Sequence, residues 1–181
     1  MATNSKNLQR IFLCCLGLFA GTAVCMKWME ADFIQHGEKF TIIGLELTYS
    51  KAKLASILTG LDEHVRTILR YHLSFDFVFM VAVYPGIAVL CLIARNRSRS
   101  LQLQKILCVV AALQLVAWGC DIMENYCLLK WIHKPVIGNE FMLYHFIVVI
   151  KWLIALGGAV LGISLSVRKI RIIRYSNNNR G

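Results

Sequence analysis

The chain has 181 residues, of which 57% are hydrophobic and only 17% are charged, and its formal net charge is +10. Soluble domains have about 25% charged residues, and disordered proteins are poor in apolar residues. The composition therefore excludes a disordered chain and argues against an ordinary soluble globule. The positive charge fits either a nucleic-acid-binding protein or a basic membrane protein, so its distribution along the chain decides between them.

Four apolar segments are long enough to cross a bilayer, which takes about 18 residues or more. They comprise residues 11–28, 73–94, 106–129 and 141–167. The first follows Lys6 and Arg10, as the apolar region of a signal peptide would, but its packing glycines favour a retained helix. The sequence predicts an all-α membrane protein with one domain, residues 1–181, built as a bundle of four transmembrane helices.

The positions of Lys and Arg predict the orientation of the chain. Three basic segments share one side of a four-span protein: the N-terminus, the loop after the second span and the C-terminal tail. Their basic residues are Lys6, Arg10, Arg95, Arg97, Arg99, Lys105, Arg168, Lys169, Arg171, Arg174 and Arg180. The long outer loop, residues 29–72, instead has five basic residues against six acidic ones. Both termini are therefore expected in the cytoplasm.

The same basic clusters explain the net charge without nucleic acid, because basic residues beside spans contact anionic lipid headgroups. No zinc-finger spacing, glycine-rich phosphate loop or RNA-binding aromatic motif accompanies them, so the expected partner is the lipid bilayer and not nucleic acid. The seven cysteines form no C-x-x-C pair. They are expected to pack as small apolar residues, and the sequence indicates no metal site and assigns no cofactor.

The outer loop has internal structure. Apolar residues recur at helical spacing over residues 51–70, which predicts an amphipathic helix with Ser50 as its N-cap and a mild interruption at Gly60. This helix is expected to lie on the outer surface or cap the bundle, and to run on into the second span. The apolar segment 40–47 is too short to span. It predicts an extended segment or a dipping turn that places Glu46 beside apolar neighbours.

Two pairs of glycines have the G-x-x-x-G spacing that lets helix backbones approach closely in lipid. Gly17 and Gly21 lie in the first span, and Gly158 and Gly162 lie in the fourth. Each pair is a candidate for closing either the bundle or a homo-oligomer. Pro85 lies in the middle of the second span and is expected to kink it.

Polar and ionisable residues inside spans mark functional sites by default, because they are costly in lipid. Asp121, Glu124 and Asn125 fall on one stripe of the third span with Gln114, and Lys151 shares its helix face with packing glycines. The long Lys151 side chain is expected to reach about 6 Å outward toward Asp121. The candidate binding residues of the outer half are Glu46, Asp76, Gln114, Asp121, Glu124, Asn125, His145 and Lys151.

The charges of this constellation do not balance. Lys151 and Asp121 are expected to form an ion pair, which leaves Asp76 and Glu124 without an obvious cation. One of these acids is therefore expected to be protonated, or to hold a proton or cationic ligand. His145 lies about 120° around the helix from Lys151, so the two side chains need not point together.

Several short motifs occur in a defined order along the chain. They are Leu45-Glu46-Leu47, Leu73-Ser74-Phe75-Asp76-Phe77 with Phe79 and Tyr84, Asp121-x-x-Glu124-Asn125, and Lys151-Trp152. In this order the chain resembles an uncharacterised bacterial family of small four-span membrane proteins, although the cysteines and the histidine of its third and fourth spans depart from that pattern. The resemblance implies a bacterial inner-membrane location and the acidic, amide and lysine positions above as the site, and it implies no reaction.

Three functions remain open from the sequence. The first is a binding or proton-coupled site, for a small polar ligand or a proton, in the outer half of the bundle. The second is a membrane-embedded enzyme that acts on a lipid or isoprenoid headgroup and uses the carboxylates with His145 as general base. The third is a structural or assembly protein whose buried charges only hold helices together.

Overall fold

The computed structural model describes residues 2–35 and 37–178, with side chains for residues 5–35 and 37–167. Its long helices are α1 (Ala2–Met29), α4 (Glu63–Arg97), α5 (Leu101–His133) and α6 (Glu140–Asn178). Each contains an apolar stretch long enough to cross a membrane. The predicted bundle of four apolar helices is thus confirmed, while the basic tail from residue 168 onward lies outside the residues with described side chains.

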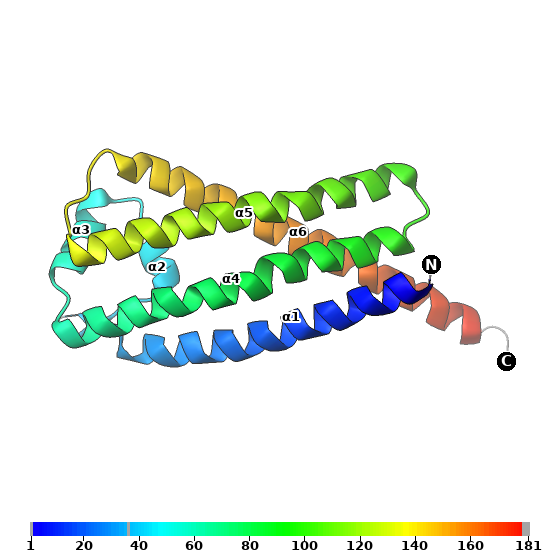
Figure 1. Ribbon diagram of the computed structural model, residues 1–181, viewed down its shortest axis with the longest axis horizontal. Helices are drawn as coiled ribbons and strands as arrows, with labels where there is room; N and C mark the ends of the chain where they lie inside the picture. Colours follow the sequence, from blue (N-terminus) through cyan, green and yellow to red (C-terminus); the bar gives the residue numbers. More distant parts are fainter. Residues whose placement is uncertain (1, 36, 179–181) are drawn as a thin grey trace.

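The long helices run lengthwise beside one another, and α4 contacts α1, α5 and α6. Figure 1 shows the shorter elements gathered at the end of the bundle that lies opposite the N-terminus. These shorter elements are η1 (Glu30–Asp32), β1 (Ile34–Gln35), β2 (Glu38–Lys39), α2 (Ile42–Glu46) and α3 (Lys51–Thr59). Strands β1 and β2 pair antiparallel, with Ile34 opposite Lys39.

The predicted amphipathic helix over residues 51–70 is two helices. Ser50 caps α3 as expected, because its side chain accepts a hydrogen bond from the Lys53 amide. The helix ends at Gly60, and Asp62 caps a new helix by accepting from the Val65 amide. An N-cap side chain satisfies an amide that has no partner within the helix. The second half of the predicted helix and the whole second span therefore form one continuous helix, α4.

The segment before α3 is also more ordered than the sequence indicates. Residues 42–46 form the short helix α2, and the Thr41 side chain caps it by accepting from the Gly44 amide. Ile42, Leu45 and Glu46 of this helix are buried. The extended alternative is thus wrong, whereas the alternative of a turn that places Glu46 beside apolar neighbours is close to the short helix that the structure has.

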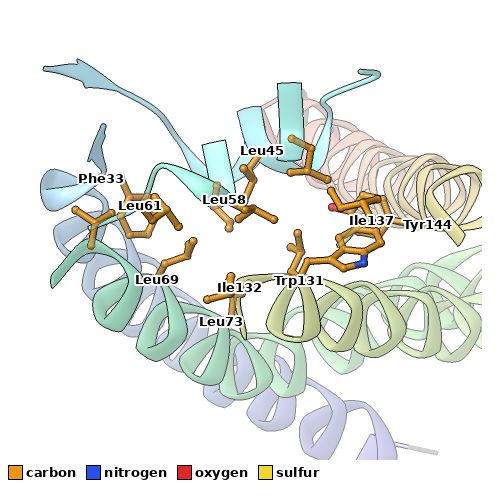
Figure 2. Close-up of a cluster of buried hydrophobic side chains, with 14 of the residues drawn as sticks. Phe33, Leu45, Leu58, Leu61, Leu69, Leu73, Trp131, Ile132, Ile137 and Tyr144 are labelled. Carbon is orange, nitrogen blue, oxygen red and sulfur yellow. The ribbon is translucent and has the colours of Figure 1, made fainter. Parts of the chain in front are cut away.

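A hydrophobic cluster joins the shorter elements to the long helices. Figure 2 shows side chains of α2, α3, α4 and α5 that point toward one another, with Leu45, Leu58, Leu73 and Trp131 among them. These four residues are at most 1% exposed. Because burial of a leucine side chain stabilises by about 1.5–3 kcal/mol, this cluster fixes α2 and α3 against the bundle.

The two glycine pairs differ in their surroundings. A Cβ atom added at Gly158 would lie 2.5 Å from Gln114 Nε2, and one added at Gly162 would lie 2.9 Å from Leu90 Cγ. At Gly17 and Gly21 an added Cβ would meet nothing within 4 Å. The α6 pair therefore packs inside the bundle, against α4 and α5.

Candidate functional site

Lys151 stands at the centre of a buried cluster of charges. Its Nζ atom lies 2.9 Å from Asp121 Oδ1, 2.6 Å from Glu124 Oε2 and 3.3 Å from Glu46 Oε2. The Glu124 residue is fully buried, and the other three are 5–7% exposed. We call Glu46, Asp121, Glu124 and Lys151 the carboxylate cluster.

Helix periodicity brings these side chains together. On α5, Ala117, Asp121, Glu124 and Leu128 are all buried, so the two acids lie on one inward face. On α6, Tyr144 and Val148 are buried on the same face as Lys151. The third element is the short helix α2, which the sequence analysis did not predict. Its last residue, Glu46, brings a third carboxylate to Lys151.

A hydrogen-bonded extension links the cluster to α4. The Tyr84 hydroxyl donates to Asp121 Oδ2 at 2.7 Å, and Asn125 Nδ2 donates to Asp76 Oδ2 at 2.7 Å. Tyr84 belongs to the motifs quoted above but was not among the candidate site residues. The signal that could have placed it is its spacing from Asp76 in two steps of four residues, which keeps both on one broad helix face.

Two predicted site residues do not join the carboxylate cluster. The Gln114 side-chain amide donates to the backbone carbonyls of Val110 and Ile154. The His145 ring packs 4.1 Å from the ring of Tyr49, and within the described part of the chain neither of its nitrogens has a hydrogen-bond partner. The enzyme hypothesis requires a hydrogen bond between His145 and one of the acids, and this structure does not have it.

The prediction that Glu124 lacks a cation is wrong, because its carboxylate makes the shortest contact with Lys151. The imbalance of charge nevertheless remains. One ammonium group faces three carboxylates, and Asp76 lies nearby with an amide as its hydrogen-bond partner. Unbalanced charge in a buried site is costly, so such groups take up protons or cations.

Glu46 is the last residue of α2, which lies in the loop between α1 and α4 and outside the four long helices. Burial raises the pKa of its carboxyl group above the ordinary value, and the neighbouring Asp121 carboxylate raises it further. The positive charge of Lys151 and hydrogen bonds with Glu124 and Lys151 act in the opposite direction. The net direction is upward, which favours the protonated form of Glu46.

Polar atoms without partners surround the charges. Among the described residues, Tyr144 Oη and Asn125 Oδ1 are buried and make no hydrogen bond. Tyr144 is 1% exposed and Asn125 is 0% exposed. A buried polar group without a partner is unusual and often marks a water or ligand site. No group of His, Cys, Asp and Glu within the described residues has an arrangement that would hold a metal ion.

The chain matches no known family model, and neither a curated protein nor a solved structure is detectably similar to it. Its four apolar helices are those of a multi-pass integral membrane protein, by length and composition. The chemistry of the site must therefore be argued from the geometry of this chain alone.

Proposed function

We propose that this chain is a multi-pass protein of the bacterial inner membrane, with both termini in the cytoplasm, whose carboxylate cluster binds and releases a proton. The bacterial location rests on the ordered motifs of the resemblance, and the orientation rests on the basic segments. The site lies toward the outer end of the bundle, on the side of α2 and α3.

The observation that carries this proposal is the contact of one lysine with three buried carboxylates. If all four groups were ionised, the cluster would hold a surplus of two negative charges in a medium of low dielectric constant. A proton on one carboxyl reduces that surplus at no steric cost. Glu46 is the best carrier, because its oxygen is the farthest of the three from Lys151 Nζ and its pKa is raised.

Proton binding at Glu46 connects the charge of the cluster to the position of α2. When Glu46 is neutral, its attraction to Lys151 weakens, and the short helix loses one of the contacts that hold it over α5 and α6. When Glu46 is ionised, the ion pair draws α2 back. The site is therefore a proton-coupled site of the outer half, and a small polar ligand would enter beneath α2.

The first prediction concerns the pH dependence of stability. The folded protein keeps a proton on Glu46 to a higher pH than the unfolded chain, whose carboxyl titrates near the ordinary value of 4.5. The stability that this proton contributes is full below that value and is lost as the pH rises through the folded pKa. We expect the free energy of unfolding of the purified protein in detergent to fall with rising pH in this window, and Glu46→Gln to flatten the curve.

The exposed Glu38 on β2 provides the control, because Glu38→Gln removes an acid outside the cluster. Infrared spectra recorded as the pH is raised above the ordinary carboxyl pKa should show a protonated-carboxyl band that persists to higher pH in the wild type and Glu38→Gln than in Glu46→Gln. If the cluster only holds helices together with all its acids ionised, Glu46→Gln and the wild type will share the same pH dependence and the same carboxyl band. That result would refute the proposal.

A further inference from the structure

An apolar groove runs along the outside of α6 and ends against α2. It has a volume of about 590 Å³ and extends from Val149 to Leu161 along the helix, with Leu47 closing its outer end. Twelve residues of helix correspond to a length of about 18 Å. Gly157 forms part of the groove, and an added Cβ there would meet nothing within 4 Å.

The groove begins near the outer boundary of the hydrocarbon core and passes its midplane. From Asp76 to Arg97 the α4 helix rises about 31 Å, close to the 30 Å thickness of the hydrocarbon core. With Arg97 at the inner boundary, Asp76 lies at the outer boundary. Gly158 and Gly162 of α6 lie beside Ile87 and Leu90 of α4, so Lys151 lies about 6 Å deeper than Asp76. From the level of Lys151 to Leu161 the groove descends about a further 15 Å.

The wall between the groove and the cluster is thin and faces lipid. Leu47 follows Glu46 in sequence, and Trp152 follows Lys151, so both neighbours of the ion pair line the groove. The outward residues of α2 are apolar, since Ile43 is 48% exposed and Leu47 is 40% exposed. Apolar exposure at this level is expected toward acyl chains and not toward an aqueous channel.

The charge of the carboxylate cluster, which adjoins the groove, favours a lipid with a cationic headgroup. The adjoining carboxylate cluster has more acids than bases, so it attracts an ammonium group for the same reason that it attracts a proton. Trp152 packs 5.4 Å from Lys151 Nζ, which links groove and cluster directly.

We propose that this groove binds one acyl chain of an outer-leaflet lipid whose headgroup carries a primary ammonium group, and that the ionised carboxylate of Glu46 binds this ammonium group. The proposal rests on the proposed function, because the lipid ammonium and the proton compete for one carboxylate. Access to the site is lateral, from the bilayer, past Leu47 and Trp152.

The test uses full-length protein taken from vesicles of equal phosphatidylethanolamine and phosphatidylglycerol with identical acyl chains, and native mass spectrometry of the lipid it retains. The wild type should retain phosphatidylethanolamine several-fold over phosphatidylglycerol. Gly157→Leu fills the groove and should abolish retention of both lipids. Gly17→Leu makes the same change on α1, where an added Cβ is equally unopposed, and should retain lipid as the wild type does.

Glu46→Gln should keep lipid in the groove but lose the preference for phosphatidylethanolamine over phosphatidylglycerol. The control variant Glu38→Gln should keep that preference. Equal retention of both lipids by the wild type, or unchanged retention by Gly157→Leu, would overturn the proposal. Its failure is distinguishable from failure of the proton site. The carboxyl band assigned to Glu46 does not require the groove, so Gly157→Leu should keep that band even though it binds no lipid.

Discussion

Lys151 determines the electrostatics of the half of the bundle that adjoins α2, since its ammonium group touches Glu46, Asp121 and Glu124. Removing a buried cation leaves its partners unpaired in a medium that solvates charge poorly. The resulting decrease in the free energy of unfolding therefore exceeds the attraction between any two of the groups, because each unpaired carboxylate adds its own desolvation cost.

We predict that Lys151→Met destabilises the protein by about 3–5 kcal/mol. The measurement is the free energy of unfolding in mixed detergent at neutral pH. The loss should shrink at low pH, where the stranded acids become protonated. A lysine on the same side of the molecule provides the control, because Lys130 forms an exposed ion pair with Glu140 at 3.6 Å. Lys130→Met should change stability little, and equal losses for the two variants would contradict this account.

At the residue scale the sequence predicted much of the cluster. The pairing of Lys151 with Asp121 followed from helical periodicity and from comparing depths across spans. The contact of Glu46 with Lys151 joins residues 105 positions apart. It depends on the path of the loop that carries α2, which no helical period determines. Tyr84 lay within a quoted motif but needed the structure to show its hydrogen bond to Asp121.

Among the elements, α6 has glycines with opposite roles at adjacent positions. Gly158 is buried where α6 crosses α4 and α5, and a Cβ there would lie 3.0 Å from Ile87 Cγ2 as well as against Gln114. The Gln114 side chain is held by two carbonyl groups, so it does not move away freely. Gly157 faces the groove and has open space around it.

We therefore predict that Gly158→Ala destabilises the bundle by about 1–3 kcal/mol through overpacking. Gly157→Ala should be neutral or stabilising by up to about 1 kcal/mol, since alanine favours the helix. Thermal unfolding of the two variants side by side provides the measurement. Equal stability of both variants would mean that α6 does not cross its neighbours at Gly158.

The elements were predicted well where apolar runs are long and poorly where they are short. The four spans appear as helices, because any long apolar segment in a membrane must satisfy its backbone groups internally. The division at Gly60 was underestimated. A glycine followed two residues later by a strong N-cap, Asp62, both ends one helix and starts the next.

For the whole molecule, the testable property is its orientation. Both ends of the bundle bear charged loops, and only the surplus of Lys and Arg predicts which end faces the cytoplasm. We predict that a membrane-impermeant maleimide added to intact cells labels Lys53→Cys in α3 but not Ser98→Cys between α4 and α5. Permeabilised cells should label at both positions. The reverse pattern in intact cells would invert the topology and place the carboxylate cluster at the inner surface.

The division of the cluster between helices has a consequence for biosynthesis. Asp121 and Glu124 belong to α5, whereas their cation belongs to α6, and only residues 134–139 separate the two helices. An unpaired acidic residue within a span makes insertion less favourable, by up to roughly 2.5–3.5 kcal/mol for Asp at the centre of the helix. A ribosome makes α5 before the lysine that neutralises it. The third and fourth spans should therefore enter the bilayer together, as a helical hairpin whose charges meet before either helix faces lipid alone.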